Sequence, residues 1–121
     1  MKTWLIRSAA LVAAILMLAG GPFMNTATAG GKVALVLDVG GRGDLSFNDM
    51  GFKGADEAEA KLGVDVVEIQ SNSAADYLPN MQNAARSGKF DLVVAVGFLL
   101  ADAMAEVAAQ FPDQKFAIID V

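Results

Sequence analysis

The chain has 121 residues, with no cysteine, no histidine, nine Lys and Arg, and fourteen Asp and Glu. The lack of cysteine and histidine excludes thiolate chemistry, imidazole general-base catalysis, disulfides, and metal sites built on sulfur or imidazole. The formal net charge of −5 argues against nucleic-acid and anionic-membrane partners, because such binding depends on Lys and Arg neutralising phosphates.

The first 29 residues have the features of a cleaved signal peptide. Lys2 and Arg7 form a basic start, residues 9–19 are an uninterrupted apolar stretch, and Ala27-Thr28-Ala29 matches a small-x-small cleavage site. The apolar stretch is shorter than the ~20 residues of a spanning helix, and an uncleaved N-terminal anchor is the alternative interpretation. We therefore predict a signal peptide at 1–29 and a folded part at 30–121.

The same segment predicts where the protein is located. A lipoprotein would carry a cysteine after Leu18-Ala19-Gly20, but this position holds Gly21, so we expect no lipid anchor. An exported protein without an anchor needs an outer barrier to retain it, so we expect a periplasmic protein. Without Lys2 and Arg7, the remaining chain carries seven Lys and Arg against fourteen Asp and Glu.

Alternating strand and helix patterns predict an α/β fold. We expect strands at 32–39, 64–70, 91–96 and 116–119, and helices at 47–62, from 75 or 76 to just before Gly88, and at 99–111. The order βαβαβαβ predicts a parallel, doubly wound sheet with helices on both faces. Strand 64–70 alternates and is expected near the sheet edge, whereas strand 91–96 is apolar throughout and is expected to be central.

Local signals predict how the helices begin and end. Ser46 followed by Asp49 resembles a capping box for helix 47–62, and Gly63 is expected to end this helix. Pro79 fits the second helix only if it lies in the first turn. A face of small residues predicts close packing of helix 47–62 on the sheet: Gly51, Gly54, Ala55, Ala58 and Leu62.

The carboxyl ends of parallel strands meet at one edge of a sheet, where ligands bind. Phe47 offers a stacking face and Asn48 an amide, a pairing that suits a flat ligand with polar edges. The other residues expected at this edge are Asp38 with its glycine-rich loop, Ser71-Asn72, Gly97-Phe98 and Asp120.

Plainer interpretations of these residues stay open. Asp38 and Asp120 could be ordinary strand-end residues, Ser46 a helix cap, and Phe98 part of the core. The glycine-rich loop matches neither a dinucleotide fingerprint nor a phosphate-binding loop, and Asp44 would repel a phosphate. We expect a binding protein rather than an enzyme, with no cofactor and no metal.

The stretch Asp38-Val-Gly-Gly-Arg-Gly-Asp-Leu-Ser-Phe-Asn-Asp49 resembles the N-terminal signature of the basic membrane protein (BMP) family. This family is the purine-nucleoside receptor type of ABC-transporter substrate-binding proteins. The resemblance continues through 73–77, 91–98 and 111–120. It implies a type 1 periplasmic-binding-protein fold, with two α/β lobes, the ligand in the cleft between them, and an ABC permease in the membrane as partner.

The resemblance also implies roles for single residues. Phe47 would stack on a nucleobase, Asn48 and Asp120 would bond its edges, and Asp38 would lie close by. We expect a monomer that binds a nucleoside-like ligand. The candidate ligand-binding residues are Asp38, Ser46, Phe47, Asn48, Gly97 and Asp120.

The resemblance covers an incomplete first lobe, which would present half a cleft and leave the apolar side of the last strand uncovered. Two other functions stay open from the residues alone. One is a small stand-alone flavodoxin-like sensing or signalling domain, and the other is the front half of an exported sugar- or nucleotide-modifying enzyme. A second lobe downstream would support the receptor, and a catalytic motif there would support the enzyme.

Overall fold

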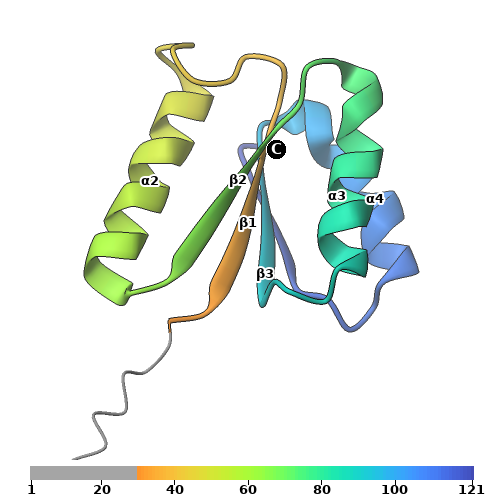
Figure 1. Cartoon of the computed structure of the whole chain (residues 1–121). Helices are drawn as coiled ribbons and strands as arrows, with labels where there is room; N and C mark the ends of the chain where they lie inside the picture. The colour runs from red at the N-terminus through yellow and green to blue at the C-terminus, as the bar shows by residue number, and fades with distance from the viewer. Residues whose placement is uncertain (1–29) are drawn as a thin grey trace, which may run out of the picture.

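Strands and helices alternate along the computed structural model, which describes residues 30–121 (Figure 1). None of the helices within these residues is long and apolar enough to cross a membrane. The predicted signal peptide and Gly21 lie outside the described residues. The strands are β1 (Lys32–Leu37), β2 (Asp65–Gln70), β3 (Leu92–Val96) and β4 (Phe116–Ile119), and the helices are α2 (Phe47–Leu62), α3 (Tyr77–Arg86), α4 (Ala101–Gln110) and the short 3-10 helices η1 (Ala74–Asp76) and η2 (Phe98–Leu100).

The strands form one sheet in the order β2-β1-β3-β4, and every neighbouring pair is parallel. Val36 of β1 pairs with Ile69 of β2 on one side and with Ala95 of β3 on the other. β2 is therefore an edge strand and β3 a central one, and both predictions are confirmed. From β1 the chain first goes to β2 on one side, and it then crosses back over β1 to β3 on the other side. The strand order therefore reverses beside β1, as in other doubly wound sheets.

Helices cover both faces of the sheet, with α2 on one face and α3 and α4 on the other (Figure 1). Successive side chains of a strand point to opposite faces, so β1 contributes to two apolar cores. Val36 packs in the larger core with Met81 of α3. Leu37 packs on the other face with Phe52 of α2 and Val96 of β3. The predicted doubly wound α/β fold is confirmed.

The ends of the helices follow local backbone chemistry. α2 spans the predicted residues 47–62 and ends at Gly63, whose φ of 66° lies in the left-handed region that favours glycine. The Gly63 N–H donates to the Glu59 carbonyl at 3.1 Å. Pro79 is the third residue of α3 and lies in its first turn, as predicted, where a missing N–H costs no helical hydrogen bond.

Two predicted boundaries were wrong by a few residues. β1 ends at Leu37 instead of Val39, because the Asp38 carboxylate accepts a hydrogen bond from the Gly40 N–H at 2.8 Å and turns the chain. The third helical segment begins with the 3-10 helix η2, because the Leu100 N–H bonds the Gly97 carbonyl three residues back at 3.2 Å. The α-helix itself therefore starts at Ala101.

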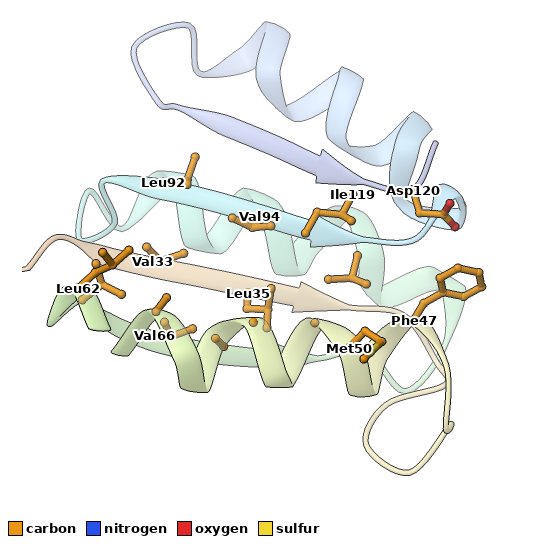
Figure 2. Close-up of a pocket in the computed structure, with 16 residues that line it drawn as sticks. Val33, Leu35, Phe47, Met50, Leu62, Val66, Leu92, Val94, Ile119 and Asp120 are labelled. Atoms are coloured by element: carbon orange, nitrogen blue, oxygen red, sulfur yellow. The ribbon is translucent and has the colours of Figure 1, made fainter. Parts of the chain in front are cut away.

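Helix α2 covers only part of its face of the sheet. An apolar groove of about 540 Å³ lies between α2 and strands β1, β3 and β4 (Figure 2). Gly51 lies against the sheet as predicted, since a Cβ there would be 3.0 Å from Val96 Cγ2. A Cβ at Gly54 would meet nothing within 4 Å, and Leu62 is 71% exposed, so close packing was wrongly predicted for these two residues. The apolar side of β4 is uncovered among the described residues, as expected, and Ile119 lines the groove.

The two glycines of α2 give a matched pair of substitutions. Gly54→Ala should raise the free energy of unfolding by about 1 kcal/mol, because alanine is the better helix former and meets no neighbour. Gly51→Ala should gain clearly less or destabilise, because its methyl group would press on Val96. Urea unfolding of both variants measures the difference, and equal gains would contradict the packing of α2 described above.

Candidate functional site

The carboxyl ends of the four strands meet at one edge of the sheet, as predicted. Two backbone hydrogen bonds tie neighbouring ends together. The Ser71 N–H, just after β2, donates to the Leu37 carbonyl at 3.3 Å, and the Gly97 N–H, just after β3, donates to the Ile119 carbonyl at 2.9 Å. Asp38 follows β1 and Asp120 follows β4. Residues far apart in the sequence are thereby brought to one surface.

Asn48 joins two carboxylates beneath this surface. Its side-chain Nδ2 donates to Asp38 Oδ1 at 2.7 Å and to Asp44 Oδ2 at 2.9 Å. The residue is 2% exposed, and its Oδ1 has no hydrogen-bond partner among the described residues. Because both N–H bonds of the amide are already used, Asn48 can offer a ligand only its oxygen, as an acceptor.

Asp44 caps helix α2. Its carboxylate accepts hydrogen bonds from the backbone N–H groups of Ser46 at 2.9 Å, Asn48 at 3.0 Å and Asp49 at 3.1 Å. The predicted capping box of Ser46 and Asp49 is wrong, since the Ser46 side chain makes no capping bond and is exposed. Asp49 instead accepts from the N–H groups of Gly43 and Leu45. The sequence does contain a signal for this cap, because Asp is a preferred residue just before a helix. The Ser-x-x-Asp spacing of Ser46 and Asp49 led to the wrong capping residue.

The hydrogen bonds around Asp44 also change its acidity. Desolvation raises the pKa of this carboxyl, but the bonds from the backbone of Ser46, Asn48 and Asp49 and from the Asn48 amide outweigh it and lower the pKa from 3.8 to about 2. The carboxylate therefore stays charged at neutral pH, at the positive end of α2. Leu45 is held between these acidic residues at a φ of 53°, a conformation that leucine rarely adopts.

Phe47 and Asp120 lie at the same end of the groove beside α2 (Figure 2). Phe47 is the first residue of α2 and is 53% exposed, so about half of its surface is open to solvent and not packed in the core. Asp120 is exposed and has a φ of 65°. Phe47 begins the first helix of the described chain and Asp120 follows its last strand, and the sheet order brings them to one edge.

Gly97 and Phe98 follow β3, the strand between Asp38 and Asp120. Gly97 is buried with a φ of 98°, and a Cβ on it would lie 3.4 Å from Asp38 Oδ2, so glycine fits this position. Phe98 is 64% exposed, and the interpretation of Phe98 as a core residue is wrong. The reason is the 3-10 turn of η2, which buries Leu100 instead.

The charge at this edge is negative. Asp38, Asp44 and Asp120 all contribute carboxylates near the strand ends. Arg42, the one basic residue of the loop 38–49, is directed elsewhere: its guanidinium pairs with Glu68 of β2 and lies 3.7 Å from the centre of the Phe52 ring. Among residues 30–121, no group of three or more acidic side chains is arranged to hold a metal ion. The arrangement suits a ligand that donates hydrogen bonds and disfavours an anionic one.

The acidity of Asp44 gives a pH-dependent prediction. Because its folded pKa lies below the ordinary value of 3.8, its contribution to stability is complete above that value and is lost as the pH falls through about 2. Asp44→Ala should therefore lower the urea midpoint at neutral pH, and the difference from the unmodified protein should shrink between about pH 4 and pH 2. Asp56→Ala, an exposed position on α2, is the control. A difference that is absent at neutral pH, or constant down to about pH 2, would contradict the capping role.

Comparison with known proteins gives the family. Residues 31–121 match the Bmp family, described as ABC transporter substrate-binding protein PnrA-like. A protein of Pyrococcus abyssi described as an uncharacterized lipoprotein is 48% identical over 101 residues, which cover 84% of this chain and 25% of the relative. The ABC transporter nucleoside-binding protein BmpA of Lactococcus lactis is 34% identical over 123 residues, 93% of this chain and 35% of that protein.

A solved structure agrees with both matches. The crystal structure of ABC transporter system solute-binding proteins from Aeropyrum pernix K1 has a TM-score of 0.71 and 50% identity, and the match covers 74% of this chain and 24% of that one. The chain thus spans about a quarter of the length of the Pyrococcus relative. The resemblance seen in the sequence is confirmed, and the chain belongs to the Bmp family of PnrA-like ABC-transporter substrate-binding proteins.

Proposed function

We propose that this chain is part of the N-terminal lobe of an exported receptor. The receptor binds a nucleoside-like ligand, and we propose a purine nucleoside. The observation that carries the proposal is the half-exposed Phe47 ring beside the Asp38–Asn48 pair and Asp120. The name of the Lactococcus relative, a nucleoside-binding protein, supports the ligand class.

The chemistry of the edge favours a nucleoside over a nucleotide. Asp38, Asp120 and the Asn48 Oδ1 atom are all acceptors, so they suit the N–H and hydroxyl groups of a base and a ribose. A phosphate would meet several carboxylates and no basic side chain of the loop, since Arg42 is paired with Glu68. Phe47 supplies the flat apolar face that a nucleobase needs.

The remaining candidate residues have supporting roles in this proposal. Ser46 is exposed next to Phe47 and would offer its hydroxyl to the ligand, and Gly97 lets the Asp38 carboxylate lie against the backbone just after β3. A second lobe would close over the ligand and provide the other wall of the cleft, and the closed form would be recognised by the permease. Residues 30–121 would be the first lobe, in part.

Export and location belong to the same proposal. Residues 1–29 would direct export and be removed, and the monomeric receptor would work in the periplasm beside its permease. The Pyrococcus relative is called a lipoprotein, which differs from the expectation of no lipid anchor at Gly21, and that expectation stays a prediction.

Calorimetric titration of the full-length, signal-free protein tests the ligand class. The panel contains purine and pyrimidine nucleosides, their 5′-monophosphates, free bases and pentoses. We expect tight binding of purine nucleosides and much weaker binding of the monophosphates. A folded protein that binds none of the nucleosides, or that prefers the monophosphates, would contradict the proposal.

Phe47→Ala should weaken nucleoside binding by roughly 1–3 kcal/mol, the range found when an aromatic side chain that stacks on a base is removed. Phe47→Tyr keeps the ring and should retain most of the affinity. The same titration measures both variants, with circular dichroism to check folding. If Phe47→Ala binds nucleosides as tightly as the unmodified protein, Phe47 is not a stacking residue.

A further inference from the structure

We propose that Phe98 is a second apolar contact of the ligand, placed between the carboxylates of Asp38 and Asp120. The inference rests on the proposed function and deepens it, because it assigns part of the ligand-binding surface to a residue outside the six candidates. Three features of the described residues carry it: the strand order, the backbone of Gly97 and the exposure of the Phe98 ring.

The strand order puts the end of β3, which Gly97 and Phe98 follow, in the middle of the candidate site. β3 lies between β1, which ends next to Asp38, and β4, which ends next to Asp120. Neighbouring strands are about 4.8 Å apart, so the ends of β1 and β4 are separated by about 10 Å with the end of β3 between them. A ligand that contacts both carboxylates must therefore pass over the end of β3, where Gly97 and then Phe98 follow.

The position of the Gly97 backbone determines where the backbone of Phe98 lies. Its N–H is bonded to the Ile119 carbonyl at 2.9 Å, which holds it to the end of β4. On its other side a Cβ would lie 3.4 Å from Asp38 Oδ2, so the carboxylate of Asp38 is close to this glycine. Phe98 thus follows a residue that is bonded to the end of β4 and lies close to the Asp38 carboxylate.

The fold does not use the Phe98 ring for its own core. In η2 the third residue, Leu100, is fully buried, whereas Phe98 is 64% exposed. Phe47 and Phe98 are the two phenylalanines among the exposed large apolar residues of the described chain, and both lie at the carboxyl edge of the sheet. Two exposed aromatic rings at the edge that also carries the carboxylates fit a flat heterocycle with hydrogen-bond donors at its rim.

The buried Asn48 adds an independent indication of a ligand at this edge. Its Oδ1 atom lacks a hydrogen-bond partner among the described residues although the side chain is almost completely buried. Buried polar atoms are nearly always paired, so this acceptor calls for a donor that is not part of residues 30–121. An N–H group of a ligand that reaches Asn48 beside Phe47 would supply one.

The test is titration of the full-length, signal-free protein and three variants with a purine nucleoside, its free base and a pentose. Phe98→Ala should weaken binding of the nucleoside and the base roughly tenfold, within the range measured for aromatic contacts with bases, and leave pentose binding unchanged. Phe98→Leu, which keeps an apolar side chain, should lose less. Leu62→Ala is the control, since Leu62 is similarly exposed but lies at the far end of α2.

The outcomes separate this inference from the proposed function. If the unmodified protein binds the nucleoside and Phe98→Ala, folded by circular dichroism, binds it equally well, the inference is wrong and the proposed function stands. The inference is also wrong if Leu62→Ala loses as much affinity as Phe98→Ala. If the unmodified protein binds neither nucleoside nor base, the proposed function fails and the inference fails with it.

Discussion

The side-chain amide of Asn48 is the contact on which the carboxyl edge of the sheet depends. It places two N–H bonds between the carboxylates of Asp38 and Asp44, which would otherwise repel each other in a partly buried place. Through Asp38 the contact reaches the end of β1, and through Asp44 it reaches the first turn of α2. Phe47, the neighbour of Asn48, is held with it, so one buried amide sets the position of the exposed ring.

The same arrangement determines what the edge can recognise. The side-chain donors of Asn48 and the backbone N–H groups of Ser46, Asn48 and Asp49 are used within the protein, and the carboxylates remain as acceptors toward the ligand. A site of acceptors and aromatic faces suits flat ligands that donate hydrogen bonds, and it disfavours anions. The apolar groove beside α2 meets this edge at Phe47 and Asp120, and beyond them it is lined mainly by aliphatic side chains (Figure 2).

Much of the fold could be predicted from the sequence, because its signals are local and strong. Helix α2 and strand β4 have the predicted bounds, since Gly63 marks where the helix stops and a short apolar run marks the strand. The cap at Asp44 was missed although its hydrogen bonds are local, because Ser46 offers a competing capping pattern. The exposure of Phe98 was not predictable in this way, because Phe98 follows Gly97, whose N–H is bonded to the Ile119 carbonyl of another strand.

The central claim is that a nucleoside lies over the carboxyl edge of the sheet, against Phe47. A crystal structure of the full-length receptor grown with a purine nucleoside tests it most directly. The account predicts density for the base on the Phe47 ring, with its rim between Asp38 and Asp120 and an N–H within hydrogen-bonding distance of Asn48 Oδ1. Density for the nucleoside among the aliphatic side chains of the groove beside α2, or at any other site that leaves Phe47 free, would contradict it.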